Sequence, residues 1–193
     1  MTQKTIHDSH AACPYWLAWT LDNPVRRWLH NPQEIFDGLV WPGQTVLDLG
    51  CGIGYFSLAL ARVVGENGRV VAVDLQQEML AAVRRRAEKE GLLPRIVLCQ
   101  AEAGHIDLDL QADFALAFWM VHEVPDRAAL FGQVYRLVKP GGRFLMVEPN
   151  LFLESVNYQK SVDLALAAGF TVLSHPRIRI SQSTLFEKPG LLS

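Results

Sequence analysis

Three closely spaced glycines, Gly50, Gly52 and Gly54, stand between two acidic side chains, Asp48 and Asp74. A short apolar run precedes the glycines and a helical pattern follows them, so the loop connects a buried strand to a helix. Glycines in such a loop let a ligand approach the main chain closely. Asp74 ends the next apolar run, where a carboxylate can accept hydrogen bonds from both hydroxyls of a ribose. The spacing therefore predicts a site for a nucleoside.

This loop departs from the pattern that binds a dinucleotide. A pyrophosphate loop has the pattern G-x-G-x-x-G, whereas Tyr55 stands where the third glycine would be and Gly54 comes one residue early. Asp48 would repel a pyrophosphate but would suit a ligand that carries ammonium and sulfonium groups. Two alternatives stay open: a nicotinamide or flavin nucleotide, and a tight turn that binds nothing.

Alternating strand and helix patterns must position the glycine loop. Apolar runs predict five strands at Thr45–Leu49, Arg69–Val73, Ile96–Cys99, Phe114–Phe118 and Arg143–Val147. Helical spacing predicts helices at Tyr55–Val64, at Gln77–Glu90, after Asp126 and near Ser155–Ala168. Two final runs, about Phe170–Ile180 and Ser183–Glu187, predict a hairpin at the sheet edge. This order predicts a mainly parallel α/β sheet with helices on both faces and ligands beyond the carboxyl ends of its strands.

The N-terminal segment differs from the rest in being rich in Trp, Pro, Asn and His. Asn23-Pro24 and Asn31-Pro32 each place a capping residue before a proline at the first helical position, which predicts two or three short helices. We expect residues 1–41 to form a helical N-terminal arm and residues 42–193 to form the α/β domain.

Composition narrows the function classes. The chain has 193 residues, half of them apolar and 20% charged, and its net charge of −2 gives no strong signal for nucleic acid. Three scattered cysteines indicate a reducing compartment, and the absence of paired CxxC or HExxH motifs predicts no metal. The polar start and the lack of a long apolar stretch predict a cytoplasmic protein without a membrane span.

Four segments carry a family resemblance. VLDLGCGIG resembles the first motif of class I S-adenosylmethionine-dependent methyltransferases, and VVAVDLQQEML, CQAEA and YRLVKPGGRFLMVEP resemble segments that follow it in that family. The resemblance covers roughly residues 44–189. It implies a Rossmann-like, seven-stranded and mostly parallel sheet of order 3-2-1-4-5-7-6, with strand 7 antiparallel. It also implies S-adenosyl-L-methionine as the cofactor.

The resemblance further implies roles for matching positions around the glycine loop. The three glycines would line the methionine part of the cofactor, and Asp48 would support its amino group through water. Asp74 would bind the ribose, and Leu75 would pack on the adenine. The resemblance thus implies a contact with the cofactor for both acidic side chains, Asp48 and Asp74.

Two later strand ends complete the expected cofactor site. Where the family often has Asp-Ala at the end of strand 3, this chain has Gln100, Ala101 and Glu102. Either Gln100 or Glu102 would then contact the adenine amino group. Phe118, at the end of strand 4, would pass close to the reacting methyl group.

The chemistry expected of such a site is an in-line displacement, so the protein must mainly align the acceptor and exclude water. A general base is needed only when the acceptor begins protonated. His122 is the candidate base, because histidine titrates near neutral pH, or else it caps the loop structurally. Glu123 either orients His122 or faces water. Tyr15 is a third catalytic candidate, on an arm that either closes over the cofactor as a lid or docks on the sheet.

The expected function is methyl transfer to a small, partly apolar acceptor, nearest to the subgroup that includes ubiquinone/menaquinone C-methyltransferases. The alternatives are an NAD-dependent oxidoreductase, a non-catalytic cofactor-binding module and an RNA methyltransferase. The dispersed arginines Arg26-Arg27, Arg84–Arg86 and Arg177/Arg179 fit a solvated surface better than contact with RNA. The sequence leaves a homo-oligomer open.

Overall fold

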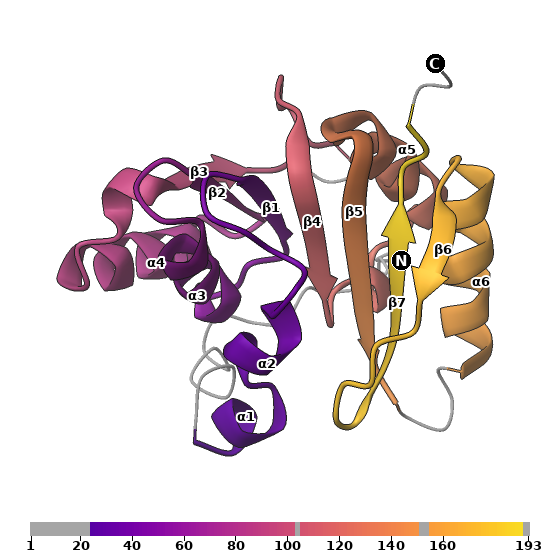
Figure 1. The fold of residues 1–193 in the computed structure, drawn as a ribbon, viewed down its shortest axis with the longest axis horizontal. Coiled ribbons are helices and arrows are strands. Elements are labelled where there is room, and N and C mark those ends of the chain that lie inside the picture. The colour runs from indigo at the N-terminus through magenta and orange to yellow at the C-terminus, as the bar shows by residue number, and fades with distance from the viewer. Residues whose placement is uncertain (1–23, 103–104, 151–154, 191–193) are drawn as a thin grey trace, which may run out of the picture.

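The strands form one sheet in the computed structural model, which describes residues 24–102, 105–150 and 155–190 (Figure 1). The order across this sheet is β3-β2-β1-β4-β5-β7-β6. The strands are β1 (Thr45–Leu49), β2 (Arg69–Asp74), β3 (Ile96–Gln100), β4 (Ala112–Phe118), β5 (Val138–Pro149), β6 (Thr171–Ser174) and β7 (Ser181–Glu187). The predicted strand order is therefore confirmed.

Strand directions also match the prediction. β1 lies between β2 and β4 and pairs with both in parallel, and β4 pairs with β5 in parallel. β7 runs antiparallel to β5 and to the edge strand β6, which confirms the predicted terminal hairpin. The carboxyl ends of the parallel strands therefore meet at one edge of the sheet, where α/β folds bind ligands.

Helices cover both faces of the sheet. The described helices are α1 (Pro24–Leu29), α2 (Pro32–Phe36), α3 (Tyr55–Val64), α4 (Gln77–Lys89), α5 (Arg127–Leu137) and α6 (Ser155–Ala167), with short 3-10 turns η2 (Leu93–Arg95) and η3 (Val121–Glu123). None of these helices is long and apolar enough to cross a membrane. Side chains alternate between the faces of β1, so Val46 packs in the core with α3 and α4 while Leu47 packs with α5 and α6.

Capping residues begin two of these helices where the sequence predicts. The Asn31 side chain accepts a hydrogen bond from the Gln33 N–H at 3.1 Å and starts α2. The Asp126 carboxylate accepts one from the Ala129 N–H at 2.9 Å and starts α5.

The fifth strand begins earlier than the sequence predicts. It starts at Val138 rather than at Arg143 and includes Pro140-Gly141-Gly142, which the pattern assigns to a turn. Gly141 has a φ of 76° and donates its N–H to the Lys188 carbonyl at 2.7 Å, so this segment stays in the sheet through an irregular pairing. The predicted strand lies inside the observed one.

Candidate active site

One cavity of about 630 Å³ lies at the carboxyl ends of β1, β2 and β4. Its walls come from the glycine loop after β1, the turn after β2, the loop after β4 and α1. The predicted site residues in its lining are Asp48, Gly50, Gly52, Asp74, Leu75, Ala101, Glu102, Phe118, His122 and Glu123. Gly54 and Gln100 lie outside the lining, and Tyr15 lies outside the described residues.

The glycine loop contributes to the site in two different ways. Gly50 has a φ of 63°, and a Cβ there would come within 2.8 Å of the Met120 Cβ, so only glycine lets the loop pass beside the loop after β4. Gly54 has a φ of 82°, and a Cβ there would meet Leu58 and Val83 at 2.9 Å and 3.0 Å. Gly54 therefore allows α3 and α4 to pack closely.

Asp48 is buried in the centre of the sheet. It faces the same side of β1 as Val46, toward α3, and its carboxylate accepts a hydrogen bond from the Ser57 Oγ at 2.5 Å. Burial raises the pKa of Asp48 to about 7; the Ser57 hydrogen bond and the Arg26 charge oppose this shift, and the Asp74 charge adds to it. A cation in the cavity would stabilise the ionised form, so this carboxylate suits a positively charged group.

Asp74 is held rigidly at the end of β2. Its two carboxylate oxygens accept hydrogen bonds from the Gly52 N–H at 2.9 Å and from the Gln76 N–H at 3.0 Å. Burial raises the pKa of Asp74, while these backbone hydrogen bonds act in the opposite direction. The fixed carboxylate lines the cavity one strand away from the glycine loop, where hydroxyl groups of a ligand could donate to it.

Gln100 and Glu102, the two candidates for the adenine contact near the end of β3, differ in their surroundings. The Gln100 side chain is exposed and donates from Nε2 to the Leu75 carbonyl at 3.2 Å, outside the cavity. Glu102 lines the cavity, and its backbone forms an isolated bridge with His105. Of the two, Glu102 is therefore the one that a ligand in the cavity could meet.

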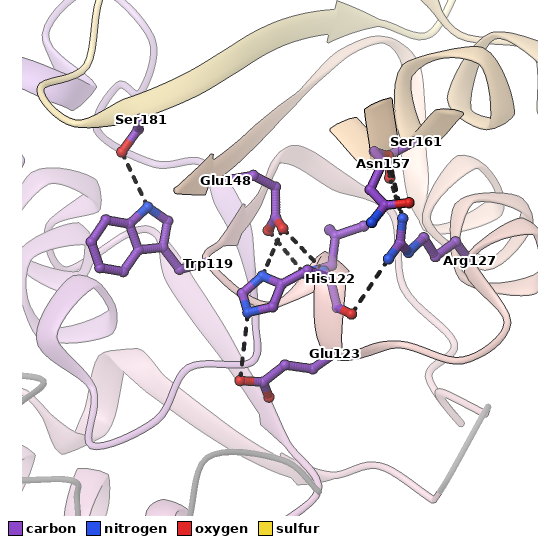
Figure 2. Close-up of polar contacts among 9 residues, drawn as sticks. Trp119, His122, Glu123, Arg127, Glu148, Asn157, Ser161 and Ser181 are labelled. Atoms are coloured by element: carbon purple, nitrogen blue, oxygen red, sulfur yellow. Dashed lines mark hydrogen bonds and ion pairs between the residues drawn. The ribbon is translucent and has the colours of Figure 1, made fainter. Parts of the chain in front are cut away.

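The loop after β4 is fixed by a buried carboxylate from β5 (Figure 2). Glu148 is 4% exposed and accepts hydrogen bonds from the Val121 N–H at 3.0 Å and the His122 N–H at 3.0 Å. Its Oε2 also lies 2.7 Å from the His122 Nδ1. The Glu123 carboxylate stands on the other side of the ring, 3.9 Å from Nε2. His122 is thus held at both its backbone and its ring, with its second nitrogen in the cavity region.

Glu148 is a residue that the sequence analysis misses. It ends the apolar part of β5 as Asp74 ends that of β2, and this repeated strand-end acid is the signal that could have identified it. The contact it makes joins the end of β5 to the loop after β4, 26 residues apart along the chain. Only the parallel pairing of β4 with β5 brings them together.

Trp119 shapes the same loop through an unusual backbone. Its φ is 57°, in the left-handed region that side chains other than glycine rarely adopt. The Trp119 N–H donates to the Val147 carbonyl at 2.7 Å. Its indole Nε1 donates to the Ser181 Oγ at 3.1 Å (Figure 2), so hydrogen bonds hold both the backbone and the side chain. These contacts hold the indole in the cavity wall beside Phe118.

The charges around the cavity fit S-adenosylmethionine, the cofactor that the resemblance implies. Among the charged side chains of the lining, carboxylates outnumber basic groups, and the only lysine or arginine among its described residues is Arg26. A ligand with two cationic groups and one carboxylate matches this balance. Within the part of the chain that the structure describes, no cluster of three or more His, Cys, Asp or Glu could hold a metal ion.

Comparisons with known proteins agree with this geometry. The sequence profile of a family described as "Methyltransferase domain" matches residues 42–176. A ubiquinone/menaquinone biosynthesis C-methyltransferase UbiE of Haemophilus ducreyi is 37% identical over 107 residues, which are 55% of this chain and 41% of that protein. An arsenite methyltransferase of Halobacterium salinarum is 33% identical over 103 residues, 53% of this chain and 26% of that protein. The matched segment thus spans about two fifths or less of these curated relatives.

A solved structure is similar over nearly the whole chain. A SAM dependent methyltransferase from Aquifex aeolicus superposes with a TM-score of 0.84 at 23% identity, covering 92% of this chain and 100% of that one. At this identity the similarity establishes the fold alone.

Proposed function

The chain belongs to the class I S-adenosylmethionine-dependent methyltransferase family, and we propose that it transfers a methyl group to a small, partly apolar acceptor beside His122. S-adenosyl-L-methionine is the cofactor of this family, and when bound it supplies an electrophilic methyl group on a sulfonium leaving group. The observation that carries the proposal is one cavity that contains both the glycine loop and the His122 ring held by Glu148.

The cofactor would be held by residues from three strand ends. Asp48 would face its ammonium group, and the fixed carboxylate of Asp74 would accept hydrogen bonds from its ribose hydroxyls. Leu75, which is 47% exposed at the cavity wall, would pack on the adenine. Glu102 is our candidate for the adenine amino group, because the Gln100 side chain turns away to the Leu75 carbonyl.

His122 would act as the general base for an acceptor that begins protonated. A carboxylate accepts hydrogen bonds only, so Glu148 favours the tautomer in which Nδ1 carries the proton and Nε2 offers its lone pair. Nε2 would take the acceptor's proton as the new bond to the methyl carbon forms. Glu148 would fix the direction of the ring, and the three-way contact of its carboxylate would keep the loop in place.

The acceptor class is inferred from the walls near His122. Apolar side chains from the end of β4, from the loop that follows it and from the end of β5 line the cavity with His122: Phe118, Trp119, Val124, Pro125 and Pro149. Such walls favour a molecule with an apolar or planar part. The curated relatives named for ubiquinone and menaquinone biosynthesis support a small molecule rather than RNA.

The test combines cofactor binding with methyl transfer. Calorimetry measures binding of S-adenosylhomocysteine and of NAD, and transfer of a labelled methyl group is measured to a set of small phenols and quinols and to RNA. We expect binding of S-adenosylhomocysteine, no binding of NAD, and label in at least one small acceptor. Transfer to RNA alone, with binding that weakens steeply as salt rises, would contradict the acceptor class.

The role of His122 is tested by His122→Gln with Glu123→Gln as the matched control. Loss of a general base lowers turnover by about 10²- to 10⁴-fold, while S-adenosylhomocysteine affinity stays within about twofold because the cofactor residues are intact. The acidic limb of the pH–rate profile should disappear in His122→Gln and remain in Glu123→Gln. Full activity at every pH together with a lower melting temperature would make His122 a structural residue.

A further inference from the structure

Arg26 lies inside the cavity although its sequence context suggests a solvated surface. It is half-buried on α1 and lines the cavity. Its guanidinium carbon stands 5.2 Å from the ring centroid of Trp119 and 5.7 Å from those of Tyr55 and Phe118, with Phe56 at 5.8 Å. Aromatic rings at such distances attract a guanidinium group and limit where it can point. The neighbouring Arg27 is exposed and lines no part of the cavity.

The helix that carries Arg26 is fixed at its other end. The Arg179 side chain, from the connection between β6 and β7, donates to the Trp28 carbonyl at 2.6 Å and stacks over the Trp28 ring at 5.0 Å. The His30 Nε2 lies 3.1 Å from the Arg179 carbonyl, and the Tyr55 hydroxyl donates to the His30 carbonyl at 3.0 Å. α1 therefore lies at the bottom of the view, on the side where β4 ends (Figure 1). The contacts with Arg179 and Tyr55 hold the helix that carries Arg26.

Arg26 is the only arginine or lysine among the described residues that line the cavity. Five carboxylates line the cavity, and among the described lining residues a single arginine and no lysine face them: Asp48, Asp74, Glu102, Glu123, Asp126 and Arg26. The cofactor's sulfonium and ammonium groups match the carboxylates. Its own carboxylate, a few bonds from the ammonium group, is repelled by them and needs a cationic partner.

Three backbone donors of the glycine loop are already used within the protein. The Cys51 N–H donates to the Val73 carbonyl at 3.0 Å, and the Gly54 N–H donates to the Cys51 carbonyl at 3.0 Å. The Gly52 N–H donates to the Asp74 carboxylate at 2.9 Å. These three groups are therefore committed, and the loop cannot use them for a carboxylate without giving up its own hydrogen bonds.

We propose that Arg26 binds the carboxylate of the cofactor's amino-acid end, so that Asp48 and Arg26 together recognise its ammonium and carboxylate groups. This inference rests on the proposed function, because it needs S-adenosylmethionine in the cavity. A guanidinium group suits the task, since its planar fork binds a carboxylate through two parallel hydrogen bonds. It also gives the N-terminal arm a direct part in cofactor binding, through α1.

The test compares two ligands that differ only in that carboxylate. Calorimetry measures binding of S-adenosylhomocysteine and of its decarboxylated analogue to the wild type, Arg26→Met, Arg26→Lys and the control Arg27→Met. We expect Arg26→Met to weaken S-adenosylhomocysteine binding by about 10- to 100-fold, the usual effect of losing a hydrogen bond to a charged group, and to leave the analogue unchanged. Arg26→Lys should lose less, and Arg27→Met nothing.

The other outcomes separate a structural role of Arg26 and a role in acceptor binding from failure of the proposed function. Equal weakening of both ligands would overturn the proposal and make Arg26 a structural residue of the arm, while unchanged analogue binding shows that the variant has folded. If neither ligand is weakened but the KM for the methyl acceptor rises, Arg26 faces the acceptor and the proposal is wrong. If the wild type binds neither ligand, the proposed function itself fails.

Discussion

Replacing the buried Asp48 by asparagine should make the ligand-free protein more stable at neutral pH. The folded state raises the pKa of Asp48 from 3.8 to about 7, mainly through burial. Below about pH 4 both the folded and the unfolded chain hold the proton. Between pH 4 and 7 the unfolded chain ionises while the folded chain keeps its proton, so the free energy of unfolding falls as pH rises.

The size of this effect follows from the difference between the two pKa values. A difference of about three units corresponds to about 4 kcal/mol, of which about 3 kcal/mol is lost between pH 5 and 8. Because Asp48 is 2% exposed, solvent screening does not reduce this figure. An asparagine side chain cannot ionise, and its amide oxygen can still accept the Ser57 hydrogen bond, so the variant escapes the loss.

Urea unfolding of the wild type and Asp48→Asn at several pH values measures the difference directly. The stability advantage of the variant should grow by about 3 kcal/mol from pH 5 to pH 8. Asp163→Asn, which replaces an exposed aspartate on α6, is the control and should follow the wild-type curve. Parallel curves for wild type and Asp48→Asn would refute the reasoning, because they would mean that Asp48 titrates alike in both states.

Three further substitutions test other parts of the site. Asp74→Ala should weaken S-adenosylhomocysteine binding by about 1–3 kcal/mol, since the ribose hydroxyls would lose their acceptor, and an unchanged dissociation constant measured by calorimetry would exclude the ribose role. Glu148→Gln should lower the free energy of unfolding by about 1–3 kcal/mol, because an amide cannot accept hydrogen bonds from all three N–H groups that now donate to the carboxylate. An unchanged melting temperature would contradict this. Gly54→Ala should lower the free energy of unfolding by about 2–4 kcal/mol, because alanine is strained in the left-handed backbone and its Cβ would contact Leu58. Gly91→Ala, at a similar φ but with open space around it, should lower it by about 1–2 kcal/mol. Equal losses in urea unfolding would show that packing around Gly54 is not involved.

The sheet and the strand ends that line the cavity could be predicted because their signals are local. Apolar runs, helical spacing and the glycine loop lie within short stretches of sequence, and they identified the strand ends that carry Asp48 and Asp74. The early start of β5 was missed because Pro140-Gly141-Gly142 has the composition of a turn. Its place in the sheet depends on pairing with Lys188, far along the chain.

Residues that act through tertiary contacts could not be predicted. Nothing near Glu148 in sequence indicates that it meets His122, since the contact depends on how β4 and β5 align. Arg26 belongs to a pair of arginines that looks solvated, and its position depends on Arg179 holding α1. Gly54 shares the spacing of a ligand loop, yet its surroundings are the side chains of two helices. In each case the deciding neighbour is remote in sequence.

The contacts of Arg179 with α1 also set an order in which the protein can mature on the ribosome. β6 pairs only with β7, and β7 is the last of the described strands, so neither joins the sheet until residues up to Glu187 have left the exit tunnel. Arg179, between these strands, can hold α1 only after that. A nascent chain that ends at residue 150 would therefore contain the glycine loop and Asp74, while α1 would still lack its contacts with Arg179.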